Sequence, residues 1–94
     1  MKYVVFYDAA DDVARKAPAH FPAHLERAQA FHARGTLLMI GTFADVGRDG
    51  AMGIFTTREA AQAFVDGDPF VINGVVKAWR ILEWKEIFDV TPTP

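Results

Sequence analysis

The three histidines of the chain lie close together, at positions 20, 24 and 32, and they offer its most versatile chemistry. At about 100° per residue, a helix that begins at Pro22 places both His24 and His32 on its apolar stripe. His24 lies well inside the edges of that stripe, where a sheet should cover it. Because a neutral imidazole takes or gives a proton near physiological pH, His24 is the leading candidate for acid–base catalysis. The alternative is a core histidine whose nitrogens are satisfied by the backbone.

Asp68 is the best-placed partner for His24. A catalytic histidine needs a pocket and gains from a carboxylate that fixes its tautomer. Asp68 follows a second predicted helix, and both helices should cover one sheet face, so residues at the end of one helix can meet side chains of the other. In the simpler alternative, Asp68 only caps the turn before Pro69. Tyr7, at the end of the first predicted strand, could line the same pocket or simply terminate that strand.

Metal or heme binding is a third use that the histidines allow. His20 and His24 have the i,i+4 spacing of some zinc sites, but Pro22 lies between them, and no glutamate follows His20 as in the H-E-x-x-H motif. His32 lies close to the predicted helix end, where the helix dipole favours a structural histidine. We therefore expect no metal and no cofactor. A visible absorption spectrum or a metal analysis of purified protein would test heme or metal at His24 or His32.

Length and composition bound the possible functions. The 94 residues suffice for one domain, which we place at residues 1–90, with a loose tail over 91–94. Hydrophobic residues make up 51% of the chain and the net charge of -2 comes without a basic stripe, so neither a disordered chain nor a nucleic-acid partner is expected. The absence of cysteine excludes disulfides, thiolate zinc sites and cysteine nucleophiles, and fits a cytoplasmic location. No apolar run reaches transmembrane length, so no membrane association is expected.

The spacing of apolar, glycine and proline residues predicts six main elements. Pro22 suits the first turn of the first helix, and Gly35 follows its end. Thr56 and Glu59 have capping-box spacing before the second helix. Gly41 interrupts a strand, which indicates a bulge or a close approach of backbone or ligand. The predicted strands are 2–7, 37–44, 51–56 and 77–87, the helices are 22–34 and 60–65, and loops or turns cover 8–19, 46–50 and 68–74, with room for a helical turn at 12–16.

The β-α-β-β-α-β order predicts an α+β fold, a ferredoxin-like sandwich with an antiparallel sheet. Two helices cover one face of such a sheet, yet the predicted strands are apolar on both faces. The second face therefore needs a cover of its own. A second copy of the sheet is the simplest cover and gives a two-fold homodimer. A monomer with the loop 9–19 folded over the open face is the competing account. In the first strand the two faces are formed by Tyr3, Val5 and Tyr7 and by Val4 and Phe6.

Three segments together resemble the YciI-like (YCII-related) family, and the resemblance covers nearly the whole chain. The resemblance implies a ferredoxin-like fold paired into a dimeric α/β barrel, and a histidine–aspartate pair in a pocket, proposed as an active site. The matching positions here are His24 and Asp68. Many relatives carry Gly-Pro after the second strand, whereas this chain has Gly41-Thr42, so a relative's substrate does not carry across this pocket segment. The three segments are Pro22-Ala23-His24-Leu25 with 31–38, the helix 59–64, and Asp68-Pro69-Phe70 with Gly74-Val75.

The combined prediction is a small cofactor-independent enzyme of a largely unassigned family. His24 would act as general acid or base and Asp68 would orient it, in an elimination or isomerisation of a small, cyclic or aromatic substrate. Tyr7, Gly41 and Phe70 would line the substrate pocket. Within the resemblance, one branch is similar to a dehydrochlorinase that acts on a chlorinated hydroxyquinol, and the wider fold group includes muconolactone isomerases and small monooxygenases. The alternative is a non-catalytic module that binds a small ligand or assists another enzyme.

Overall fold

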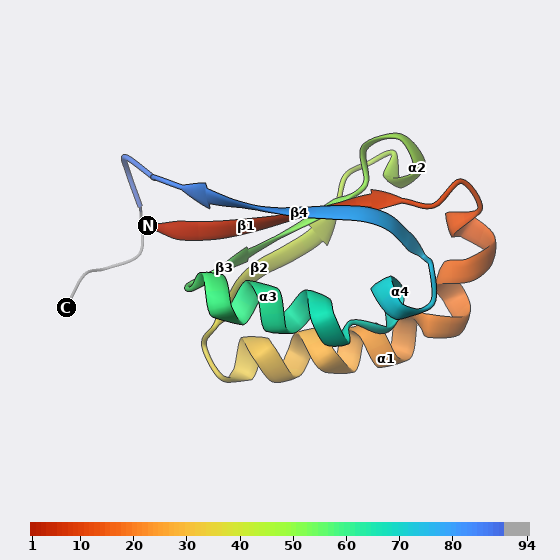
Figure 1. Ribbon diagram of the computed structural model, residues 1–94, viewed down its shortest axis with the longest axis horizontal. Helices are drawn as coiled ribbons and strands as arrows, with labels where there is room; N and C mark the ends of the chain where they lie inside the picture. The colour runs from red at the N-terminus through yellow and green to blue at the C-terminus, as the bar shows by residue number, and fades with distance from the viewer. Residues whose placement is uncertain (90–94) are drawn as a thin grey trace.

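The computed structural model describes residues 1–89, which form a four-stranded sheet and four helices (Figure 1). The strand order is β2-β3-β1-β4, and every neighbouring pair is antiparallel. This arrangement confirms the predicted α+β, ferredoxin-like fold. The tail predicted over 91–94, and residue 90 of the predicted domain, lie outside the described residues. The elements are β1 (Lys2–Ala9), α1 (Val13–Ala33), β2 (Leu37–Thr42), α2 (Val46–Asp49), β3 (Ala51–Phe55), α3 (Arg58–Gly67), α4 (Pro69–Ile72) and β4 (Val76–Trp84).

The helices α1, α3 and α4 lie on one side of the sheet, as Figure 1 shows. The register pairs Tyr3 with Phe55 and Tyr7 with Ala51, and both pairs belong to the face that meets the helices. Burial of this apolar face drives the packing of the helices onto the sheet. The core that results is formed by Val5, Tyr7, Ala28, Phe31, Leu37, Phe55, Ala61, Phe64, Val65 and Val76.

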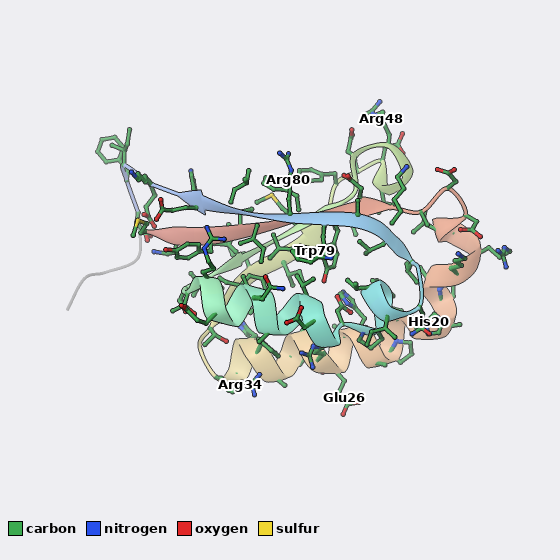
Figure 2. All side chains as sticks on the ribbon, in the orientation of Figure 1. His20, Glu26, Arg34, Arg48, Trp79 and Arg80 are labelled. Carbon is green, nitrogen blue, oxygen red and sulfur yellow. The ribbon has the colours of Figure 1, made fainter. Side chains whose placement is uncertain are left out.

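The opposite face of the sheet is also apolar, as the alternation in β1 predicted. Val4 pairs with both Ile54 and Leu82, so these three side chains share that face. Leu82, on the edge strand β4, is 43% exposed. Figure 2 shows Arg80 pointing away from the helices on this side, while its neighbour Trp79 points toward them. In the described chain, apolar side chains therefore face outward on this side of the sheet.

The first helix starts much earlier than the sequence predicted. α1 begins at Val13, so the loop predicted over 8–19 is wrong beyond residue 12, and the helical turn allowed at 12–16 belongs to a much longer helix. Pro18 and Pro22 both lie inside α1, although an interior proline removes a helical hydrogen bond and crowds the preceding turn. The alanines and long basic side chains before Pro18 have high helix propensity and offset part of the cost of the prolines. Because residues 13–19 belong to α1, the account in which they cover the open face is also wrong.

The second main helix, α3, is capped one residue later than predicted. Thr57 has an extended backbone, and its Oγ1 accepts a hydrogen bond from the N–H of Ala60 at 3.1 Å. The predicted capping box of Thr56 and Glu59 is therefore wrong, because the cap lies one residue further along the chain. The helix itself contains the whole predicted range 60–65.

Strand ends and turns differ from the predictions by smaller amounts. The β-bulge in β2 lies between Leu37 and Met39, whereas the pairing at Gly41 is regular. Helix ends and short turns are the least certain parts of any sequence-based assignment, because single-turn helices carry little periodicity. Among residues 1–89, no helix has the length and apolar character needed to cross a bilayer. The remaining differences are β1, which continues to Ala9; β2, which ends at Thr42; β3, which ends at Phe55; β4, which spans Val76–Trp84; and the single-turn helices α2 and α4, which occupy predicted turns.

Candidate active site

The structure brings His24 and Asp68 together where three helices meet. His24 Nδ1 lies 2.8 Å from Asp68 Oδ1, within the range of a charge-assisted hydrogen bond. His24 projects from the middle of α1, and Asp68 occupies the junction between α3 and α4. Asp68 is 0% exposed, whereas the His24 side chain is 13% exposed. The pair is thus sheltered on the carboxylate side and reachable on the imidazole side.

The local backbone explains why a carboxylate occurs at position 68. Asp68 is the N-cap of α4 and Pro69 is the first helical residue, a combination that favours helix initiation. Asp68 Oδ1 accepts a hydrogen bond from the N–H of Phe70 at 3.0 Å. The capping role and the contact with His24 were alternatives in the sequence. In the structure they coexist, because the same carboxylate oxygen accepts from both groups.

Tyr7 holds the second oxygen of Asp68. The Tyr7 hydroxyl donates a hydrogen bond to Asp68 Oδ2 at 2.7 Å. Burial, reinforced by the negative charge of Asp68, raises the pKa of Tyr7 well above its usual range, so the hydroxyl remains a donor near neutral pH. The sequence indicated Tyr7 only as a pocket residue. The signal for its second role is its place on the helical face of β1, where a buried hydroxyl needs a hydrogen-bond partner.

Aromatic contacts fix the plane of the His24 ring. Phe70 stacks on it, with the ring centroids 4.0 Å apart and the planes 7° apart. Phe64 meets the ring edge-on, with the centroids 6.1 Å apart. Because Asp68 holds Nδ1, Nε2 is the nitrogen left for another partner, and no residue of the described chain hydrogen-bonds to it. An ionised Asp68 keeps the proton on Nδ1 and leaves the lone pair on Nε2, the form that a base requires.

A partly enclosed cavity of about 440 Å³ opens beside this ring. Its volume lies in the range of small-molecule sites, roughly 300–1,000 Å³. His24 and the three predicted pocket residues Tyr7, Gly41 and Phe70 all line it, whereas Asp68 stands behind the wall. A methyl group added at Gly41 would meet no described atom within 4 Å, so the glycine leaves that part of the wall open.

The other two histidines lie apart from this contact. His32 Nδ1 is 2.7 Å from the carbonyl oxygen of Leu37, so His32 ties the end of α1 to the start of β2. His20 lies inside α1, one turn before His24, and not ahead of the helix as the sequence predicted (Figure 2). Over residues 1–89, no group of three or more His, Cys, Asp or Glu side chains is arranged to hold a metal ion.

The fold and this site together define a ferredoxin-like α+β domain in which a histidine and a buried aspartate meet beside an apolar cavity. The family model of the YCII-related domain matches residues 1–85. The chain therefore belongs to the YCII-related family, as the sequence motifs indicated. Two relatives, each called Protein YciI, come from Escherichia coli O6:H1 and Shigella flexneri. Each is 35% identical over 99 residues, an alignment that covers 94% of this chain and 100% of the relative.

A solved structure with the same fold is that of the 5-chloro-2-hydroxyhydroquinone dehydrochlorinase from Burkholderia phenoliruptrix, in complex with 2,5-dihydroxybenzoquinone. It superposes with a TM-score of 0.73 and covers 90% of this chain and 94% of its own. The two sequences are 20% identical, so the likeness establishes a common fold and nothing further.

Proposed function

We propose that this protein is a small enzyme in which His24 moves a proton during an elimination or isomerisation. The observation that carries the proposal is the 2.8 Å contact between His24 Nδ1 and buried Asp68 Oδ1, with the His24 ring at the cavity wall. Asp68 fixes the tautomer and stabilises the imidazolium that forms when His24 accepts a proton. Its role is therefore to orient and polarise the base.

The proton has a simple route in this arrangement. The Nε2 lone pair of neutral His24 takes a proton from a C–H or O–H group of the substrate, and the electron pair of the broken bond stays on the substrate. In an isomerisation, the same nitrogen returns the proton to a different atom. In an elimination, that electron pair forms the new double bond and the leaving group departs. The chain has no cysteine to act as a thiol nucleophile, which favours proton transfer over covalent catalysis.

Similar proteins support this class of chemistry. By its name, the dehydrochlorinase with the same fold eliminates hydrogen chloride from a small hydroxylated ring, and its structure holds a dihydroxybenzoquinone. We extend from this protein only the type of reaction and the size of the ligand, because Gly41-Thr42 differs from the Gly-Pro that we expect in many relatives.

Replacement of His24 tests the proposal directly. A screen of small halogenated and hydroxylated ring compounds would first supply a substrate. His24→Asn should then lower kcat by about 10²-fold or more, the contribution typical of general acid–base catalysis. His20→Asn, one turn earlier on the same helix, should leave kcat unchanged. Full activity of the folded His24→Asn protein would overturn the proposal.

A binding module without chemistry is the second candidate, and the cavity is the observation that favours it. In that case His24→Asn would retain the ligand found by the screen, and no condition would yield a product. Calorimetry of the wild-type and His24→Asn proteins with the same compound, followed by product analysis, separates the two functions.

We propose further that two copies pair through the open face of the sheet. Met39 is 68% exposed and Leu82 is 43% exposed on this face, which also carries Arg80, and a second sheet would remove both apolar side chains from water. Sedimentation velocity at micromolar concentration should give a dimer, and Leu82→Glu should give a folded monomer. Ile72→Glu, on α4 and 66% exposed, is the control and should remain dimeric. A monomeric wild-type protein would contradict the pairing.

The single-domain organisation and the cytoplasmic location complete the proposal. One core joins residues of β1, α1, β2, β3, α3 and β4, which supports one folding unit over the predicted range 1–90. The location rests on the absence of cysteine and is tested by fractionation of cells that express the full chain.

A further inference from the structure

The cavity beside His24 has no charged wall. None of the side chains that line it is Asp, Glu, Lys or Arg within the part of the chain that the structure describes. Its polar side chains are those of His24, Thr42 and Tyr7, and the Tyr7 hydroxyl is already bound to Asp68. A ligand in this cavity therefore finds one free imidazole nitrogen and one threonine hydroxyl in an otherwise apolar enclosure.

Two cations of the surrounding helices, Arg27 and Arg48, make their hydrogen bonds outside the cavity. Arg27 Nη2 donates to the carbonyl oxygen of Ala63 at 2.6 Å, and its Nε donates to that of Phe64. Arg48, on α2, forms a 2.8 Å ion pair with Asp49. None of these guanidinium groups lines the cavity.

The charge that lies closest behind the wall is negative. Asp68 contacts His24 and Tyr7, which both line the cavity, and its carboxylate is fully buried. In such a poorly solvated setting, a second negative charge would be repelled by Asp68 and would lose its own hydration without a cation to replace it.

We infer that this site selects an uncharged, largely apolar ring compound with one weakly acidic O–H or C–H group, and excludes carboxylates and phosphates of the same size. The inference rests on the proposed function and deepens it. Transfer of a proton from a neutral substrate to Nε2 forms an imidazolium between the Asp68 carboxylate and the deprotonated substrate. The total charge of the site does not change in this step. An anionic substrate would instead place two negative charges there before His24 is protonated.

The volume of the cavity and the side chains that line it suit a ligand with an aromatic ring. An apolar protein cavity of about 150 Å³ is enough to bind benzene. The cavity here measures about 440 Å³, so a ring with several substituents fits. Phe70, stacked on His24, lines the cavity with Phe21 and Phe64, and such rings favour stacked or edge-on contacts with another ring.

Two matched probes test the selection without any turnover. 4-Chlorophenol is mostly uncharged near neutral pH and 4-chlorobenzoate is ionised, while their rings are the same. NMR titration of the wild-type protein should show that 4-chlorophenol shifts the His24 and Phe70 signals, with an affinity at least tenfold higher than that of 4-chlorobenzoate. Equal or tighter binding of 4-chlorobenzoate, or no shift at the cavity with either probe, would overturn the inference.

A cation placed in the wall sharpens the test. Ala17 lines the cavity from α1, and Ala17→Lys should narrow or reverse the preference for 4-chlorophenol. Ala30→Lys makes the same change on an exposed position of the same helix and should leave the preference unchanged. Thr42→Lys is the second cavity variant, in case Ala17→Lys fails to fold. An unchanged preference in a folded cavity variant would overturn the inference.

The outcome is separable from that of the proposed function. These titrations measure binding alone, so their failure leaves the effect of His24→Asn on kcat intact. If instead the charge selection holds and folded His24→Asn retains full kcat, the cavity selects neutral rings but His24 is not the base.

Discussion

Asp68 and Glu86 are two carboxylates with little exposure, yet the chain holds them in opposite ways. Asp68 is 0% exposed, and the Glu86 side chain is 13% exposed. Glu86 lies 2.8 Å from Lys2 Nζ and 2.8 Å from the N-terminal ammonium of Met1, and these cations lower the pKa of Glu86 to about 2. Asp68 accepts instead from a hydroxyl, an imidazole and a backbone N–H.

Glu86 has a fixed positive counter-charge, whereas the counter-charge of Asp68 depends on the protonation of His24. Glu86 raises the pKa of the Lys2 ammonium, which stays charged near neutral pH, so this ion pair does not depend on the uptake of a proton. In direct contact with Asp68, a full positive charge appears only when His24 takes a proton. Proton uptake by His24 therefore places a counter-charge beside a buried carboxylate. That coupling is what a catalytic base needs, and Glu86 lacks it.

Removal of the Asp68 carboxylate should have the largest effect on stability. Asp68→Ala leaves the Tyr7 hydroxyl and the Phe70 N–H without their acceptor in the interior and removes the N-cap of α4. Each buried donor left without an acceptor costs about 1–3 kcal/mol, so with two of them the free energy of unfolding should fall by about 2–6 kcal/mol. Urea unfolding followed by circular dichroism measures it.

Asp68→Asn is the matched variant, because it keeps the shape and one acceptor oxygen. Its NH₂ group must face one of the donors around Asp68, so we expect an intermediate loss of about 1–3 kcal/mol. If Asp68→Ala were as stable as the wild-type protein, the hydrogen bonds at Asp68 would not hold this junction together, and the contrast with Glu86 would fail.

Tyr7→Phe should have the second-largest effect, and the effect should depend on pH. The change leaves Asp68 Oδ2 buried without its donor, at a cost of about 1–3 kcal/mol near neutral pH. Burial first, and Asp68 second, raise the pKa of folded Tyr7 above the unfolded value of about 10. A group with a raised folded pKa contributes its full stability below the unfolded pKa and loses it as the pH rises further. The difference between the wild-type and Tyr7→Phe proteins should thus shrink above about pH 10.

Tyr3→Phe is the control for this prediction, since Tyr3 lies on the same strand and face. Its hydroxyl is 3.4 Å from Glu83 Oε1 in an exposed setting, so its loss should change stability by less than about 0.5 kcal/mol. Equal effects of Tyr7→Phe and Tyr3→Phe at every pH would show that the Tyr7 hydroxyl does not stabilise Asp68.

The sheet could be predicted from the sequence because its signals are local. The apolar run of β1 and the turn predicted at 46–50 each depend on a few neighbouring positions, and the order of elements then fixes the topology. The start of α1 could not be predicted in this way. Pro18 and Pro22 are local signals for a helix boundary, yet α1 continues through both of them.

The candidate site could be predicted only in part, for a related reason. The pairing of His24 with Asp68 followed from the general placement of two helices on one face and from the family motifs. The contact of Tyr7 with Asp68 joins residues that are 61 positions apart, and it depends on the register of β1 and on the angle at which α3 ends. The 7° stacking of Phe70 on His24 depends on the single turn α4, which the sequence pattern did not reveal.

Glu86→Gln should have the smallest effect, and its dependence on pH should run opposite to that of Tyr7→Phe. The ammonium group of Lys2, and then the N-terminus, lower the folded pKa of Glu86 to about 2, below its unfolded value. A group with a lowered folded pKa contributes stability above the unfolded pKa and loses it as the pH falls through the folded value. Glu86→Gln should therefore lower Tm slightly near neutral pH, by less than Tyr7→Phe does, and the difference should vanish on acidification toward about pH 2. Thermal unfolding of both proteins across the acidic range measures this. A Tm loss that persists unchanged at the acidic end would mean that Glu86 contributes through packing and not through its charge. The fixed counter-charge of Glu86 would then not distinguish it from Asp68.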